Sequence, residues 1–249
     1  MRRAALVALV GGAAAALVAG VASLVATAAP MEDPPVVLAA ASLTEVLPRV
    51  EPGARYSFGG SSQLAQQIRQ GAPADVFLSA SPVYTQELFA AGLVGKPVAF
   101  ATNRLVLIVP RRNPAAIRSV GDLARRGELK LVVAGAKVPI GLYTREVLKR
   151  LGLLRVLRKA VSQEPDVKGV VAKVALGEAD AGFVYTTDVR PVAAKVTVIT
   201  LPVRAQPTVR YEAAIVASSQ HPAAARDLVI SLLGPDGRRE LRRAGFGIP

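Results

Sequence analysis

The segment around Gly59-Gly60 has the residue types needed to bind a small anion. An apolar strand end at Phe58 runs through the two glycines into Ser61, Ser62 and a helical pattern that continues to Ile68. The first N–H groups of a helix have no acceptor within it and together carry about half a positive charge. Glycine allows a ligand to approach the backbone, and the two hydroxyls can contact a bound oxygen or, alternatively, cap the helix.

The same arrangement recurs along the chain. The apolar run Val36–Ala41 predicts a buried parallel strand, and it ends at Ser42, the first residue of a Ser-Leu-Thr-Glu capping box. Pro48 is expected to shorten or kink the helix that follows. The apolar segment 75–79 predicts another strand after the helix that begins near Ser61. Ligands of such sheets bind beyond the carboxyl ends of the strands, where both serines are expected to lie.

A second set of strands and helices follows the proline-rich segment 110–114, which reads as a linker. We expect the strand at 104–109 to be the last one before that linker. In the second set, strands are expected at 129–134, 181–185 and 195–201, and helices after Val138 and after Asp166. The turn-rich segment 202–207 then leads to a strand at 211–216 and two final helices.

The chain is therefore expected to be an α/β protein of two lobes, each a mostly parallel sheet flanked by helices. Two hinge crossings would join the lobes, which gives a clamp with a ligand cleft between them. The first lobe would be discontinuous, residues 35–112 and 206–249, and the second lobe would be residues 113–205.

Residues 1–29 have the features of a secretory signal peptide. Two arginines precede an uncharged run from Ala4 to Val25, and an A-x-A cleavage site follows at 26–28. We therefore expect export, cleavage and a soluble periplasmic protein. An uncleaved membrane anchor is the alternative, because a run of this length can span a bilayer. The chain has no cysteine, which excludes disulfides and a lipid-modified cysteine.

The composition argues against nucleic-acid binding and against catalysis. The formal net charge is +13, but the basic residues are dispersed in short clusters, and aromatic residues make up only 4% of the chain. Stacking platforms for nucleic acid are therefore scarce, although the positive field can steer small anions. A serine hydrolase would need a base, yet the single histidine, His221, lies far along the chain and there is no G-x-S-x-G motif.

Six segments form an ordered pattern along the chain. They are Ala39–Thr44, Gly60–Ala65, Gly71–Phe77, Val138–Gly141, Gly182–Tyr185 and Gly245-Phe246. In order and spacing they resemble the periplasmic molybdate-binding proteins of ABC transporters. The resemblance implies the type II fold of periplasmic binding proteins, and high-affinity binding of molybdate, and of the similarly sized tungstate, between the lobes. It also implies delivery to a membrane permease with its ATPase, a monomeric protein and no cofactor.

The resemblance further implies a site for a tetrahedral dianion. The implied ligand-binding residues are Ser42, Ser61, Ile140, Val167 and Tyr185. The serines and the tyrosine would use their hydroxyls, and the other two residues their backbone N–H groups, so that molybdenum is held as its oxyanion rather than as a free cation. Each position has an ordinary structural alternative as a helix cap, a packing residue or a strand end, and Ser62 is the nearest alternative to Ser61.

Two features depart from the family pattern. The interval from Ser42 to Phe58 is short and contains Pro48, and Ile140 is bulkier than the small residue common at its position. Neither change removes a donor. A donor-only site should reject protonated phosphate, whereas discrimination against sulfate must depend on cavity size. Sulfate or a small organic anion remains the alternative ligand.

Overall fold

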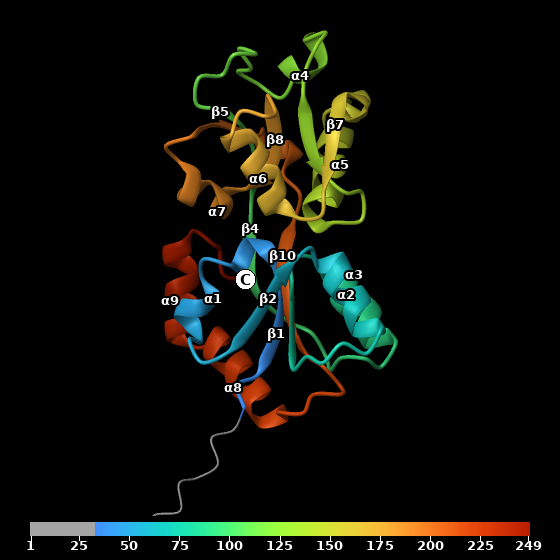
Figure 1. The fold of residues 1–249 in the computed structure, drawn as a ribbon, viewed down its shortest axis with the longest axis vertical. Helices are drawn as coiled ribbons and strands as arrows, with labels where there is room; N and C mark the ends of the chain where they lie inside the picture. The colour runs from blue at the N-terminus through green and yellow to red at the C-terminus, as the bar shows by residue number, and fades with distance from the viewer. Residues whose placement is uncertain (1–32) are drawn as a thin grey trace, which may run out of the picture. The chain divides into compact units, whose positions relative to one another are not determined.

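In a computed structural model, residues 33–249 form two lobes, each built on a five-stranded mixed sheet (Figure 1). The structure describes these residues only, and the expected signal peptide, residues 1–29, lies outside them. Within 33–249, no helix has both the length and the apolar character needed to cross a membrane.

The first sheet has the strand order β2-β1-β3-β10-β4. Its strands are β1 (Val36–Ala40), β2 (Arg55–Gly59), β3 (Val76–Ser79), β4 (Val98–Asn103) and β10 (Val209–Ile215). The helices of this lobe are η1 (Ala41–Leu43), α1 (Leu47–Val50), α2 (Ser61–Arg69), α3 (Pro82–Ala90), α8 (Pro222–Leu233) and α9 (Pro235–Ala244). β2, β1 and β3 are parallel, whereas β10 is antiparallel to β3 and to β4. The continuous apolar runs of β1 and β3 are buried, as expected of strands covered on both faces.

The second sheet has the order β7-β6-β8-β5-β9 and repeats the same plan. Its strands are β5 (Leu105–Pro110), β6 (Leu131–Ala134), β7 (Ala160–Glu164), β8 (Ala181–Tyr185) and β9 (Val196–Thr200). Its helices are α4 (Asp122–Arg125), α5 (Pro139–Arg150), η2 (Leu154–Lys159), α6 (Val167–Ala175), α7 (Thr186–Val189) and η3 (Arg190–Val192). Here β7, β6 and β8 are parallel and β5 is antiparallel to both of its neighbours.

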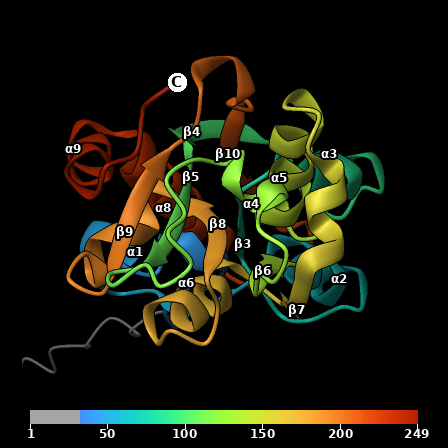
Figure 2. The same ribbon diagram turned by 90° about the horizontal axis from the view of Figure 1, so that it is seen from above.

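The strand order places helices on both faces of the second sheet. The chain moves from β6 to β7 in one direction and then back across β6 to reach β8. Because such crossovers are right-handed, the reversal puts α5 and α6 on opposite faces, as Figure 2 shows. Both helices consequently start at the same edge of the sheet, beyond the carboxyl ends of the parallel strands.

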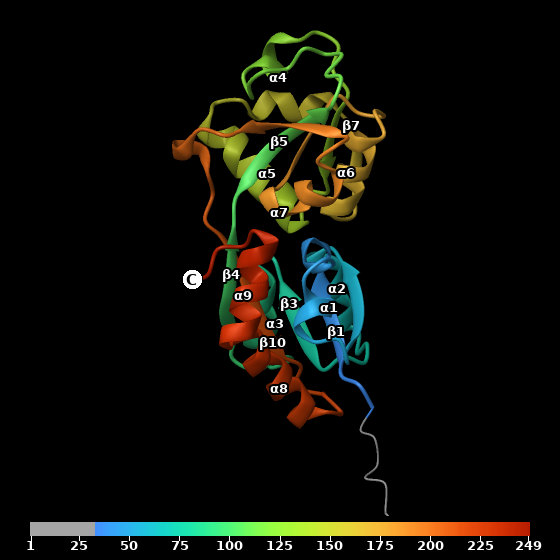
Figure 3. The same ribbon diagram turned by 90° about the vertical axis from the view of Figure 1, so that its left-hand side faces the viewer.

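The two sheets are joined at two closely spaced crossings. β4 ends at Asn103 and β5 begins at Leu105, so Arg104 alone separates the sheets on the way out (Figure 3). The return passes through η4 (Val203–Ala205). The Gln206 side chain ties the crossings together: its Nε2 donates to the Leu105 carbonyl oxygen at 2.8 Å, and its Oε1 accepts the Leu105 N–H at 3.1 Å.

This pairing corrects one expectation from the sequence. The strand expected at 104–109 falls within the range expected for the first lobe, 35–112, but β5 pairs with β8 and β9 in the second sheet. The first crossing therefore lies at Arg104, and the proline-rich segment 110–114 is a turn inside the second lobe. The apolar run of β5 indicates that the strand is buried, but it does not specify which sheet buries it.

Several local expectations can also be compared with the structure. Ser42 does not cap a helix, because it lies inside η1, where no side-chain cap forms. Pro48 lies in the first turn of α1, where proline is tolerated, so it starts that short helix and does not interrupt it. Strands β4 and β7 were not predicted. Ser81 and Asp166 cap the helices that follow them: the Ser81 side chain accepts the N–H of Val83, and the Asp166 side chain accepts two N–H groups of α6.

A cluster of aromatic side chains lies where the lobes meet. The ring of Tyr185, from β8, packs edge-on against Tyr143 of α5 and Tyr211 of β10, with centroid separations of 6.5 and 6.0 Å. Tyr211 in turn packs against Phe100 and Phe246 of the first lobe. The apolar core therefore continues from one lobe to the other beside the crossings.

Candidate functional site

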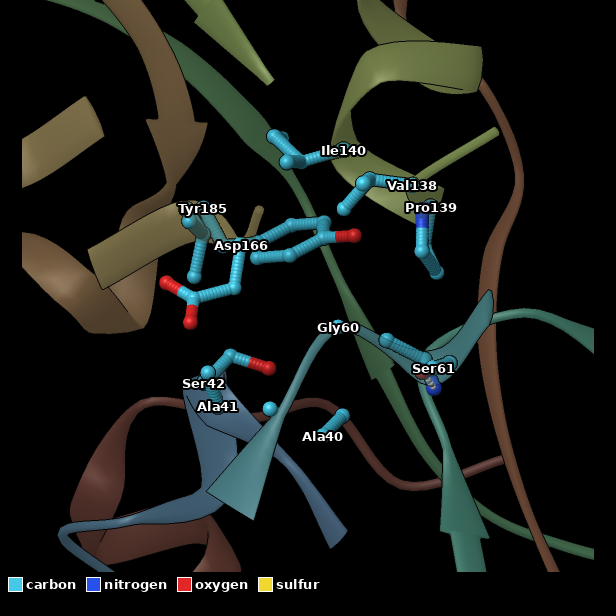
Figure 4. Close-up of a pocket in the computed structure, with 13 residues that line it drawn as sticks. Ala40, Ala41, Ser42, Gly60, Ser61, Val138, Pro139, Ile140, Asp166 and Tyr185 are labelled. Atoms are coloured by element: carbon cyan, nitrogen blue, oxygen red, sulfur yellow. Dashed lines mark hydrogen bonds between the residues drawn. The ribbon is translucent and has the colours of Figure 1, made fainter. Parts of the chain in front are cut away.

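All five predicted site residues line one cavity between the lobes (Figure 4). The complete lining is Ala40, Ala41, Ser42, Gly59, Gly60, Ser61, Ala80, Val138, Pro139, Ile140, Asp166, Val167 and Tyr185. The space between these residues is small, about 210 Å³ including the part open to solvent, so a ligand of few atoms is favoured. Each of the five predicted residues is buried.

The Ser42 hydroxyl is held from behind by the return strand. Its Oγ lies 2.9 Å from the hydroxyl oxygen of Tyr211, 169 residues further along the chain. Figure 4 shows the Ser42 oxygen pointing into the cavity. Ser42 is therefore fixed by a tertiary contact rather than by helix capping.

Ser61 is the first residue of α2, and Gly60 precedes it as the N-cap without any side-chain cap. The Ser61 Oγ accepts the N–H of Ala80 at 3.1 Å, across the carboxyl ends of the strands. Because a backbone N–H can only donate, the Ser61 hydrogen remains free to donate into the cavity. Ser62 is partly exposed and is not part of the cavity lining, so the alternative assignment to Ser62 is not supported.

Two helix N-termini of the second lobe point at the cavity. Ile140 follows Pro139 in the first turn of α5, and Val167 is the first residue of α6. The N–H groups at these positions have no acceptor within their helices. Asp166 caps α6 by accepting the N–H groups of Lys168 and Gly169, at 2.7 and 3.1 Å. That cap leaves the Val167 N–H available to a ligand.

Tyr185 ends strand β8, and its side chain is only 1% exposed. Its hydroxyl has no hydrogen-bond partner within residues 33–249. Burial raises the pKa of the phenol well above its usual value, so the group is a neutral donor. An unsatisfied buried hydroxyl costs about 1–3 kcal/mol. A ligand oxygen in the cavity, into which the hydroxyl points in Figure 4, would remove that penalty.

The sequence did not identify Asp166 as part of the cavity wall, although it immediately precedes Val167. Its carboxylate brings a negative charge to the site, partly offset by the two N–H groups that it accepts. Gly60 was expected to let a ligand approach the backbone, but in the structure it has a different role. A Cβ there would lie 2.3 Å from the Pro165 carbonyl oxygen, so at this point the backbones of the two lobes meet.

Two direct hydrogen bonds join the lobes beside the cavity. Tyr143 of α5 donates its hydroxyl hydrogen to the Ala80 carbonyl oxygen at 3.3 Å. The Tyr84 hydroxyl of α3 donates to the carbonyl oxygen of Lys137. These contacts enclose the cavity on the side of α3 and α5.

A buried carboxylate lies behind Tyr185. Asp188 of α7 is 1% exposed, and neither of its oxygens has a hydrogen-bond partner among the described residues. The nearest cation is Lys168, whose Nζ lies 3.4 Å from Asp188 Oδ1 and 3.7 Å from Glu45 Oε1 of the first lobe. Burial raises the Asp188 pKa to about 6, although Lys168 opposes the shift.

The cavity therefore presents neutral donors from both lobes. Hydroxyls come from Ser42, Ser61 and Tyr185, and N–H groups from two helix starts. Among the described residues that line the cavity, none is lysine or arginine. Such a donor set matches a small anion whose oxygens all accept hydrogen bonds, because the helix N–H groups can only donate and each hydroxyl has one hydrogen to donate.

Comparisons with known proteins agree with this geometry. Residues 25–247 match the family described as bacterial extracellular solute-binding protein. The molybdate-binding protein ModA of Mycobacterium tuberculosis is 40% identical over 224 residues, 86% of this chain and 84% of the relative. ModA of Haemophilus influenzae is 32% identical over 228 residues, 84% of this chain and 88% of the relative.

A solved structure supports the same conclusion. The periplasmic molybdate-binding protein of Azotobacter vinelandii superposes with a TM-score of 0.77 at 26% identity, covering 86% of this chain and 99% of that one. The similarity thus extends over both lobes and the two crossings. This chain belongs to the family of bacterial extracellular solute-binding proteins.

Proposed function

We propose that this protein binds molybdate, and also tungstate, in the cavity between its lobes and delivers the anion to an ABC permease. The observation that carries the proposal is the buried Tyr185 hydroxyl, which lacks a partner among the described residues and points into a cavity lined by the Ser42 and Ser61 hydroxyls. Relatives named as molybdate-binding proteins support the choice of ligand.

In this proposal the ligand is held by donors and not by a countercharge. Removing a dianion from water is costly, so several compensating contacts are needed. Each hydrogen bond to a charged acceptor contributes about 1.5–3 kcal/mol, and two helix dipoles add to the three hydroxyls. The donors are Ser42, Ser61 and Tyr185 through oxygen, and Ile140 and Val167 through backbone nitrogen.

The transport part of the proposal concerns the states of the clamp. Only the closed form brings donors from both lobes to one ligand, so binding should shift the population toward that form. A membrane permease with its ATPase would then receive the anion from the monomeric, closed protein. The match to the family of bacterial extracellular solute-binding proteins supports this type of partner.

We also propose that the protein is exported to the periplasm with cleavage of residues 1–29. The charged start, the apolar run and the A-x-A site motivate this assignment. N-terminal sequencing of the protein from its native host should give a mature chain that begins near Ala29. A chain that still begins at Met1 would indicate an uncleaved anchor instead.

Calorimetry of the purified chain without residues 1–29 tests the ligand. We expect one site per chain for molybdate and for tungstate, with much weaker binding of sulfate and phosphate. Sulfate is smaller, so it cannot reach donors on both lobes at once, and protonated phosphate presents a hydrogen to a site in which the Ile140 and Val167 N–H groups can only donate. Sulfate binding as tight as molybdate binding would overturn the choice of molybdate, and an absence of binding to all four anions would overturn the anion site.

A further inference from the structure

Asn103 ends strand β4 at the first crossing and lies outside the cavity lining. We propose that Asn103, acting through Tyr211, fixes the Ser42 hydroxyl as a hydrogen donor toward the ligand. The residue would thereby help the site to reject anions that carry a proton. This inference rests on the proposed function, because it concerns the same cavity.

The orientation of the Asn103 amide follows from its neighbours. Its Oδ1 accepts the N–H of Arg104 at 2.9 Å. Its Nδ2 donates to the Thr187 Oγ1 at 2.9 Å and to the Tyr211 hydroxyl oxygen at 3.3 Å. A flipped amide would place two donors, the Arg104 N–H and the amide nitrogen, against each other. The Tyr211 oxygen therefore accepts from Asn103, because an amide nitrogen cannot accept.

The direction of the next hydrogen bond follows from the first. Tyr211 is fully buried, and its hydroxyl has one hydrogen to donate. Its other partner among residues 33–249 is the Ser42 Oγ at 2.9 Å, so that hydrogen goes to Ser42. Ser42 then accepts from behind, and its own hydrogen is left for the cavity that it lines.

Ser61 provides an independent parallel. Its Oγ accepts the Ala80 N–H, a donor whose direction cannot reverse. Both serines thus accept one hydrogen bond from the protein, and each keeps one hydrogen to donate. A serine hydroxyl has one hydrogen and two lone pairs, so a contact that occupies one lone pair favours donation of the hydrogen to a ligand oxygen.

The expected consequence is discrimination between dianions of equal charge. Molybdate and sulfate present acceptors only, whereas phosphate at mildly alkaline pH is mainly a dianion that carries one O–H group. If Ser42 were free to turn, its oxygen could accept a hydrogen bond from that O–H group. With Ser42 fixed as a donor, the complex with phosphate lacks one hydrogen bond. We call the hydrogen bonds from Asn103 through Tyr211 to Ser42 the relay, and we expect it to lower phosphate affinity relative to molybdate affinity about tenfold or more.

Asn103→Asp reverses the relay while keeping the side-chain shape. The carboxylate still accepts the Arg104 N–H, and the Thr187 and Tyr211 hydroxyls can turn to donate to it. Tyr211 then accepts from Ser42, which presents a lone pair to the ligand. The new negative charge acts on all three dianions alike, so ratios of affinities, measured by competition with bound molybdate, isolate the effect of direction.

We expect Asn103→Asp to lower the molybdate-to-phosphate affinity ratio about tenfold or more and to leave the molybdate-to-sulfate ratio unchanged. Thr187→Val is the matched control, because it removes one partner of Asn103 but keeps the path to Ser42. Both ratios should stay as in the parent protein. Tyr211→Phe frees Ser42 to turn, so its molybdate-to-phosphate ratio should lie between those of the parent and Asn103→Asp.

Thermal unfolding of each variant checks that the fold is intact. A parent-like molybdate-to-phosphate ratio in folded Asn103→Asp overturns the relay, as does an equal fall in the molybdate-to-sulfate ratio. If Asn103→Asp does not fold, Tyr211→Phe provides the test. A parent-like molybdate-to-phosphate ratio in that variant overturns the relay. Failure of the parent protein to bind molybdate would instead contradict the proposed function.

Discussion

Tyr185→Phe is expected to weaken molybdate binding about ten- to a hundredfold, a loss of about 1.5–3 kcal/mol. The ring packing against Tyr143 and Tyr211 is kept, and one donor to a charged acceptor is removed. The ligand-free protein should be equally stable or slightly more stable, because the variant also removes a buried hydroxyl without a partner among residues 33–249. Calorimetry gives the affinity, and denaturation without ligand gives the stability.

Tyr56→Phe is the control, because it makes the same chemical change on β2 of the first lobe, outside the cavity lining. The Tyr56 hydroxyl donates to the carbonyl oxygens of Leu47 and Glu51, away from the cavity. That variant should lose some stability and keep its molybdate affinity. Tyr185→Phe with undiminished affinity would mean that Tyr185 only packs between the lobes, and the assignment of its hydroxyl to the ligand would be wrong.

The second large effect is a pH dependence that originates at Asp188. Its pKa is raised to about 6 in the folded protein, from 3.8 as the reference value, so the folded state binds more protons than the unfolded state between these pH values. The Asp188 contribution to stability is therefore largest at low pH and falls as the pH rises from about 4 through about 6. Over that window the loss is on the order of 3 kcal/mol.

Asp188→Asn removes this titration. The difference in unfolding free energy, variant minus parent, should rise across the window and become constant above it, as measured by urea denaturation at several pH values. Subtracting the parent cancels the other titrating groups. Asp227→Asn, at an exposed position of α8, controls for the loss of one negative charge. A difference that stays flat, or falls with pH, would contradict a raised pKa at Asp188.

The local pattern of the chain was sufficient to predict much of the fold. Continuous apolar runs such as Val36–Ala41 predicted strands buried on both faces, and β1 is one of them. Asp166 predicted the start of α6, because a side-chain cap depends on residues adjacent in sequence. The order of short segments, taken with a resemblance to a known family, indicated the five residues that line one cavity.

Contacts between distant residues decided the rest. The sequence shows that β5 is apolar but not that it pairs in the second sheet, because burial does not name the partner strand. It marked Ser42 as a capping residue, whereas Tyr211, on a strand that returns from the other lobe, holds the hydroxyl. Hydrogen-bond direction at the site depends on these tertiary partners: the sequence by itself determined which donors are present, and only the folded structure decided which way they point.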